Sequence, residues 1–283
     1  MSYDPQEKPQ DKQSLFGVII HSFFVVPFLL AVFGVLFFAA VRILTMEKRS
    51  IYDYLEDVNN GGTTKRWQAA FELSRQLSAK QPVAQEDRFV QAMIAAFEKS
   101  QHDDEKVRQY LALAMARSGN LAFVDPLLQT IDKEKDENLY AIITSLGILK
   151  SVKAVDVLLK YLDHDNARIR LATVIALGHI GDVKAIEPLK VKLNDTDVNI
   201  TWDAAIALAK MGDTTGKGII LKLLDRNYLQ QFPEVDPQEQ TSIMLVALQV
   251  TQNWKDPDIK TISKQLFETD KNMNVRALAQ KNL

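Results

Sequence analysis

The sequence has no cysteine and only four histidines among 283 residues. Without cysteine, disulfide bonds and thiolate chemistry are excluded, although this absence does not settle the cellular compartment. A glycine-rich phosphate loop is also missing, as is the Gly-x-Ser-x-Gly turn that carries a nucleophilic serine. The sequence therefore gives no sign of a phosphate-binding loop or of a nucleophilic serine on such a turn.

A surplus of one charge is absent as well. The chain carries 34 Lys and Arg against 36 Asp and Glu, which gives a net charge of −2. We therefore expect no strong general attraction to nucleic acid or to anionic lipid. At 47% hydrophobic and 25% charged residues, the bulk of the chain is typical of a globular protein with a large core.

One long apolar run is present near the start of the chain. Residues 15–41 contain no charged side chain and are rich in Phe, Val and Leu. About 20 helical residues cross a bilayer, so this run predicts a transmembrane helix over 15–44, preceded by a disordered polar tail over 1–14. A cleaved signal peptide fits less well, because the segment before the run is not positive and the run is unusually long. The alternative of a buried core helix would need a partner on every face.

Basic residues on the two sides of this span give its orientation. Lys8 and Lys12 precede the span, whereas Arg42, Lys48 and Arg49 follow it closely. Because cytoplasmic flanks carry more Lys and Arg, the count favours a single-pass membrane protein whose C-terminal domain is cytoplasmic.

Beyond a joint over 45–62, a segment of helical period returns every 31 residues. Four copies begin at 107, 138, 169 and 200 with no gap between them. In the third copy Ile169, Thr173, Ala176 and Leu177 fall on one face of a helix. A fixed period of this length is the sequence mark of a solenoid.

A second amphipathic segment lies between the copies and keeps the same spacing. Its apolar positions are Leu127, Leu158, Leu189 and Ile220. Each unit is therefore predicted to be two short antiparallel helices that bury their apolar stripes only by stacking. We predict a repeat domain over 63–283, with regular units over about 104–224, an acidic loop over 225–239 and further repeats over 240–283.

The third copy resembles the HEAT-like repeats of the phycobilin-lyase type, whose pattern is Asp-x-x-Val-Arg-x-x-Ala-Ala-x-Ala-Leu-Gly-x-Ile-Gly-Asp. The residues that carry the resemblance are Ile169, Arg170, Ala176, Leu177, Gly178, Ile180, Gly181 and Asp182. The resemblance covers about 63–283 and implies an all-α fold, an α-solenoid of HEAT-like helix pairs. Together with the apolar run, the whole chain is predicted to be such a solenoid preceded by a single transmembrane helix. The resemblance further implies that Arg108, Arg170, Asp182 and Asp213 make structural bonds between units.

The resemblance to HEAT-like repeats also brings two kinds of enzyme into consideration. Deoxyhypusine hydroxylase binds iron through His-Glu pairs, but no histidine in this sequence is followed by Glu. At His102 and at His164 the sequence favours a solvated turn rather than a metal site. In such a turn an Asp caps the next helix. A bilin lyase stays possible on resemblance alone. We expect that the protein is not an enzyme. We also expect no bound metal, no cofactor and no small-molecule substrate.

The resemblance implies that the second helix of each unit lines a concave side. Arg66, Arg108 and Arg170 occupy the same position of the repeat. With the core positions assigned, an outward-facing stripe falls one, five and nine residues after that position. We predict a partner-binding surface on this stripe, with a basic edge that includes Arg75. Its candidate residues are Trp67, Phe71, Gln109, Arg117, Tyr140, Leu171, Ile175, His179, Trp202, Ile206 and Lys210.

Exposed aromatic and apolar residues mark partner sites, so the predicted function is a membrane-anchored scaffold or adaptor. Its partner would be a protein, within a membrane complex such as a transporter or secretion assembly. Nucleic acid is not expected as a partner. The alternative for the stripe is that its residues touch neighbouring units.

Overall fold

The computed structural model describes residues 21–45, 49–78, 80–134 and 136–283. The predicted tail over 1–14 and the first part of the predicted span lie outside the described residues. The described part is helical and contains no strand, which confirms the predicted all-α class. The described residues divide into two compact units, the first ending at Arg49 and the second covering Ser50–Leu283.

In the described part of the first unit, a π-helical turn η1 (His21–Val25) leads into α2 (Val26–Thr45). Its segment Phe23–Arg42 has 20 residues and a mean hydropathy of 2.8. By length and composition it is able to cross a membrane, because about 20 helical residues span the hydrocarbon core. A signal sequence near an N-terminus passes the same test.

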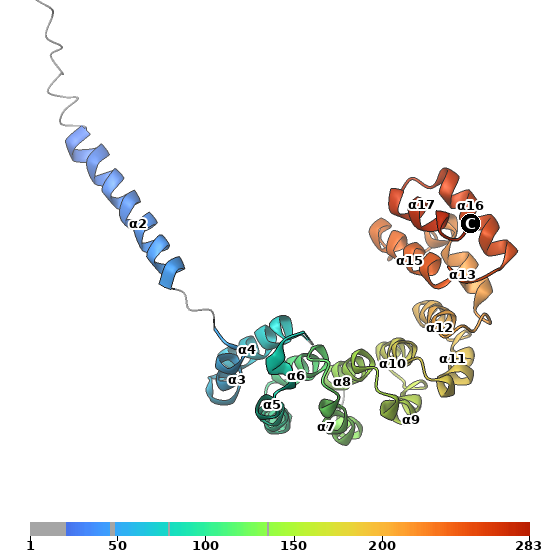
Figure 1. The fold of residues 1–283 in the computed structure, drawn as a ribbon, viewed down its shortest axis with the longest axis horizontal. Coiled ribbons are helices and arrows are strands. Elements are labelled where there is room, and N and C mark those ends of the chain that lie inside the picture. The colour runs from blue at the N-terminus through green and yellow to red at the C-terminus, as the bar shows by residue number, and fades with distance from the viewer. Residues whose placement is uncertain (1–20, 46–48, 79, 135) are drawn as a thin grey trace, which may run out of the picture. The chain divides into compact units, whose positions relative to one another are not determined.

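The second unit is a series of short helices joined by 3₁₀ turns (Figure 1). Its α-helices are α3 (Ile51–Asn60), α4 (Thr63–Gln76), α5 (Asp87–Lys99), α6 (Glu105–Arg117), α7 (Val124–Thr130), α8 (Asp136–Leu149), α9 (Val155–Leu158), α10 (Ala167–Ile180), α11 (Ile186–Lys192), α12 (Val198–Lys210), α13 (Lys217–Leu223), α14 (Arg226–Leu229), α15 (Pro237–Val250), α16 (Pro257–Thr269) and α17 (Met273–Gln280). Its 3₁₀ turns are η2 (Pro82–Gln85), η3 (Ser100–His102), η4 (Leu121–Phe123), η5 (Ile131–Lys133), η6 (Val152–Ala154), η7 (Leu159–Tyr161) and η8 (Val183–Ala185).

The predicted helix pairs stack in two rows. Helices α4, α6, α8, α10 and α12 pack side by side in the first row, and α5, α7, α9 and α11 follow one another in the second (Figure 1). The periodic leucines of the second row, Leu127, Leu158 and Leu189, are fully buried. Neither row could bury its apolar side alone, so stacking supplies the core and the solenoid prediction is confirmed.

Small residues set the distance between neighbouring helices of the first row. A Cβ atom on Gly147 would lie 2.7 Å from the Cα and Cβ atoms of Ala176. One unit further on, a Cβ atom on Gly178 would lie 2.6 Å from the Cβ atom of Ala207. The glycine of one helix therefore receives the alanine of the next, and this contact repeats with the period.

Arginines at the start of first-row helices tie consecutive units together. Arg108 is buried and donates to the Glu134 carboxylate at 2.6 Å and to the Phe97 carbonyl at 2.7 Å. Arg170 donates to both carboxylate oxygens of Asp195, at 3.1 and 3.0 Å. Each acid lies in the same unit as its arginine, and the bond to the preceding unit goes to a carbonyl, that of Phe97 from Arg108 and that of His164 from Arg170. Through these carbonyls the two arginines have the role that the resemblance implied.

The two aspartates named with them act at turns. Asp182 accepts from the Lys184 amide at 2.9 Å and caps η8. Asp213 accepts from the Thr215 amide at 2.8 Å, and its other oxygen lies 3.1 Å from Lys190 Nζ.

The segment predicted as an acidic loop, 225–239, is partly helical and packs against α12. It contains α14, and its Leu229 and Val235 side chains are buried. Tyr228 and Phe232 place their rings edge-on to Trp202, at centroid distances of 6.1 and 4.9 Å. This aromatic cluster belongs to a second hydrophobic core, formed by residues of α12 to α17, which is distinct from the core of the preceding units.

Candidate functional site

Five residues of the predicted stripe are exposed on the first row. Phe71 on α4 and Ile175 on α10 are 40% and 37% exposed, and Arg117, His179 and Lys210 stand at the C-terminal ends of α6, α10 and α12. The cations are well placed at helix C-termini, where the backbone dipole is negative. This surface therefore combines apolar side chains with a basic edge.

Two stripe residues lie in the core instead. Trp202 is 4% exposed and Ile206 is 8% exposed. The Trp202 indole N–H donates to the Tyr228 hydroxyl at 3.2 Å, which satisfies its polar atom inside the aromatic cluster. A partner could reach neither side chain without opening this part of the fold.

The other four stripe residues are half-buried between units. Lys106 lies 5.2 Å from the Trp67 ring centre, and Arg168 lies 4.1 Å from the Tyr140 ring centre. The Gln109 amide donates to Asn138 on the next helix at 3.3 Å, and Leu171 packs against the core. For these residues, contact with the neighbouring unit accounts for the side chain.

Three basic residues of the first row have no acidic partner among the described residues. Lys150 follows α8, His179 ends α10 and Lys210 ends α12, and none has an ion pair or side-chain hydrogen bond among the described residues. Burial lowers the pKa of His179, and the nearby charges of Lys210 and Lys150 lower it further. At neutral pH this imidazole is mostly neutral and the local positive charge comes from the lysines.

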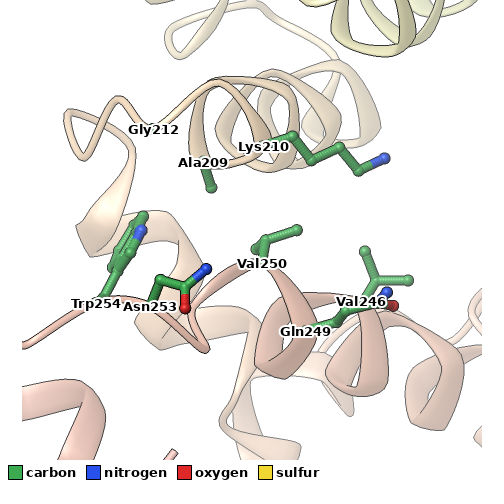
Figure 2. A pocket seen from close by; sticks show the side chains of 8 residues that line it. All are labelled: Ala209, Lys210, Gly212, Val246, Gln249, Val250, Asn253 and Trp254. Carbon is green, nitrogen blue, oxygen red and sulfur yellow. The ribbon is translucent and has the colours of Figure 1, made fainter.

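A cleft of about 620 Å³ opens beside Lys210, between α12 and α15. Figure 2 shows Ala209 and Lys210 of α12 on one wall, and Val246, Gln249 and Val250 of α15 on the other. The turn after α15 closes one end of the cleft with two further side chains, those of Asn253 and Trp254, and Gly212 completes the lining. The cleft thus mixes apolar walls with one ammonium group and two amides.

One carboxylate in this region lacks a partner. Asp203 of α12 is half-buried and has no hydrogen bond or ion pair among the described residues. Burial raises the pKa of Asp203 to about 6, and Lys210 opposes that rise. An unpaired, desolvated carboxylate costs stability when ionised, so this residue is a local weak point of α12.

Sequence reasoning missed the α15 side of the cleft. The segment 240–283 has the helical pattern but lies out of register with the 31-residue period, so no stripe position could be assigned there. Trp254, one of three tryptophans in the chain, was the available signal. An aromatic residue beside the turn residues Asn253 and Pro257 points to a surface feature, and the structure places it in the cleft.

The two histidine-containing turns have structural roles. After His102, Asp104 caps α6 by accepting from the Lys106 amide at 2.9 Å, as predicted. After His164 the cap is Asn166 and not Asp165, and His164 Nδ1 accepts from the Asn166 amide at 3.1 Å. Among the described residues no three His, Asp or Glu side chains converge in a way that could hold a metal ion.

Comparison with known proteins gives a family for the repeats. The HEAT repeat model matches residues 90–178 and 155–229. No curated protein matches the chain. Among solved structures, the chain is similar to the complex of CpcE and CpcF of phycocyanin lyase from Nostoc sp. PCC7120, with a TM-score of 0.56 and 20% identity over 84% of this chain and 97% of that chain.

An engineered protein is also similar, with a TM-score of 0.46 and 18% identity over 83% of this chain and 67% of that chain. At these identities the likeness concerns the fold.

The expectation that the chain is not an enzyme is overturned by this comparison. Phycocyanin lyase is an enzyme, and the matched chain of that structure shares the fold over 97% of its own length. The prediction rested on the missing His-Glu motif and on the predicted membrane span, and neither feature rules out catalysis in an architecture that also occurs in a lyase. From the repeat model, the stacked helix pairs and the shared architecture together, the chain is a HEAT-like repeat protein.

Proposed function

We propose that this protein is a membrane-anchored HEAT-like scaffold that binds a membrane-associated protein, such as a subunit of a transporter or secretion assembly. The observation that carries the proposal is the pairing of one helix able to span a bilayer, Phe23–Arg42, with a repeat domain that exposes apolar and basic side chains along one row. The structure that is similar to this one is itself a complex of two proteins, which is consistent with a binding role for such a domain.

Anchoring has a physical purpose in this proposal. A repeat domain held at a bilayer meets a membrane-embedded partner at a raised effective concentration, so a modest surface suffices for binding. The exposed side chains of Phe71 and Ile175 would supply apolar contacts, and Arg117 and Lys210 would orient the partner by charge.

The partner surface can be tested by crosslinking and pull-down from native membranes. The full chain is compared with the double variant Phe71→Ser, Ile175→Ser, which removes two exposed apolar groups from the first row. We expect partner recovery to fall at least about tenfold, as for loss of an apolar hot spot. Unchanged recovery with intact helical content would contradict the proposed surface.

A matched control uses a second periodic set of exposed apolar residues. Leu121, Val152 and Val183 repeat every 31 residues at the start of η4, η6 and η8, and Val183 is 76% exposed. Val183→Ser therefore removes an apolar group of similar size from another surface of the same domain. With Val183→Ser, partner recovery should stay at the wild-type level. If Val183→Ser lowers partner recovery and the double variant does not, the binding surface lies at Leu121, Val152 and Val183 instead.

Orientation forms the second part of the proposal, with the repeat domain on the cytoplasmic side. Arg42 is the last residue of the apolar segment and Arg49 follows it closely, in agreement with the excess of basic residues expected on that side. Protease added to sealed, right-side-out cells or spheroplasts should leave the exposed segment around Pro233 intact and cleave it only after lysis. Cleavage from outside would reverse the orientation.

A lyase-like activity is the second candidate function, favoured by the structural likeness to phycocyanin lyase. It is tested by incubating the purified full chain with a free bilin and apo-phycocyanin. Stoichiometric pigment binding, or pigment transfer that depends on the chain, would support a lyase over a scaffold.

A further inference from the structure

We propose that the cleft between α12 and α15 binds an acidic residue of a protein partner together with an adjoining apolar residue. This inference rests on the proposed scaffold function and specifies the chemistry of the partner. The occupant is a peptide segment with a carboxylate next to a hydrophobic side chain, inserted beside Lys210.

The lining of the cleft fits those two groups. Ala209, Val246 and Val250 form apolar walls, against which an aliphatic side chain would be removed from water. A carboxylate only accepts hydrogen bonds, and Lys210 together with the Gln249 and Asn253 amides supplies donors.

Charge complementarity selects an acidic occupant. Some lysines of the repeats have a carboxylate partner: Lys153 pairs with Asp125 at 3.1 Å, and Lys184 pairs with Asp156 at 3.0 Å. Lys210 has no such partner among the described residues, and the cationic Lys150 and the His179 imidazole lie on the same side.

Two acids lie near the cleft, but neither lines it. Asp213 is bound by Lys190 at 3.1 Å. Asp203 interacts electrostatically with Lys210 and offsets part of its charge, but it makes no ion pair or hydrogen bond with Lys210 among the described residues.

A neighbouring cleft extends the positive surface. It has a volume of about 580 Å³, shares Asn253 and Trp254 with the first, and is lined on its other side by Lys255, Lys260 and Lys281. Its one acidic side chain, Asp256, is held by Lys217 at 2.5 Å. Trp254 therefore stands between two clefts that both carry lysine, and an aromatic side chain in that place is a common anchor for a bound peptide. The space suits a segment of several residues.

The test uses the full chain in detergent and a fluorescent synthetic peptide of alternating Glu and Leu, followed by anisotropy. The comparison peptide has Gln in place of Glu, which keeps the apolar groups and removes the charge. We expect the Glu peptide to bind about tenfold more tightly at low salt, with the difference shrinking at high salt. Lys210→Gln should remove most of that difference.

Two further variants control for position and shape. Lys160→Gln neutralises an exposed lysine of η7 that has no ion pair or side-chain hydrogen bond in the described part of the chain and lies outside the cleft, and it should leave both affinities unchanged. Gln249→Trp changes an exposed residue and fills the cleft, so it should weaken both peptides.

Equal binding of the Glu and Gln peptides, or a Glu preference that survives Lys210→Gln, would overturn the inference. Tighter, Lys210-dependent binding of oligothymidylate would overturn it in favour of nucleic acid. If partner recovery from membranes still depends on Phe71 and Ile175 in those cases, the scaffold proposal stands and only the cleft's role fails.

Discussion

The regular units from α6 to α12 and the C-terminal part from α13 to α17 are both built from short amphipathic helices, but they join those helices differently. In the regular units a glycine receives the alanine of the next helix, as Gly147 receives Ala176. At the C-terminal part the contact is aromatic, because Tyr228 and Phe232 close over Trp202. The same stripe position that is exposed at Phe71 or Ile175 is thereby buried in α12 at Ile206.

This difference shows where the molecule can build a site. Glycine–alanine contacts hold α8, α10 and α12 close together, and Ile175 stays exposed on that row. A break in the period lets α15 meet α12 at a distance, which leaves a cleft lined by side chains from both. Solenoids are assembled from neighbour-to-neighbour contacts, so an irregular junction alters only its immediate surroundings.

The largest effect should come from removing the aromatic contact. Trp202→Ala deletes a buried side chain and leaves a cavity beside Tyr228, which we expect to cost about 3–5 kcal/mol of unfolding free energy. Denaturant unfolding followed by circular dichroism measures the loss. Hydrogen exchange should place it mainly in α13 to α17, and equal loss of protection in α4 to α8 would argue against two separable cores.

A smaller effect is expected from crowding the regular contact. Gly147→Ala places a methyl group 2.7 Å from the Ala176 backbone, so α8 and α10 must separate, at a cost of about 1–3 kcal/mol. Gly218→Ala in α13 is the matched control, because a Cβ atom there meets nothing within 4 Å. Thermal unfolding should show a lowered midpoint for the first variant and an unchanged or slightly raised one for the second.

The smallest effect concerns the unpaired carboxylate of α12 and depends on pH. Burial raises the pKa of Asp203 from 3.8 to about 6, so the ionised group destabilises the fold above that pH and costs nothing below 3.8. Asp203→Asn should therefore stabilise the protein by about 1–2 kcal/mol at pH 7, with the gain falling between pH 6 and pH 4. A gain that is constant with pH would show that charge is not the cause.

Much of the fold could be predicted because it is local and periodic. Leu127, Leu158 and Leu189 recur at one spacing, and this spacing alone requires stacked helix pairs. The roles of Arg108 and Arg170 followed from the resemblance and hold in the structure. The part of the candidate site at Lys210 was predicted by its stripe position, because that position is set by the helix on which it lies.

The rest required contacts between segments far apart in the chain. Trp202 has the same stripe position as Leu171, and nothing in its own helix distinguishes an open residue from one covered by a later segment. The cleft likewise depends on how far α15 stands from α12, which no local pattern contains. The prediction that the chain is not an enzyme failed for a related reason, since one architecture can serve both scaffolds and catalysts.

The sequence by itself determined that short helices would stack in register, since an apolar stripe repeated every 31 residues can be buried only against its own copies. The tertiary structure decided which parts of the first row stay open and where a cleft forms. The physical reason is that a side chain is buried, or lines a cleft, only because another segment packs opposite it. At Lys210 that other segment is α15, which lies outside the 31-residue repeat.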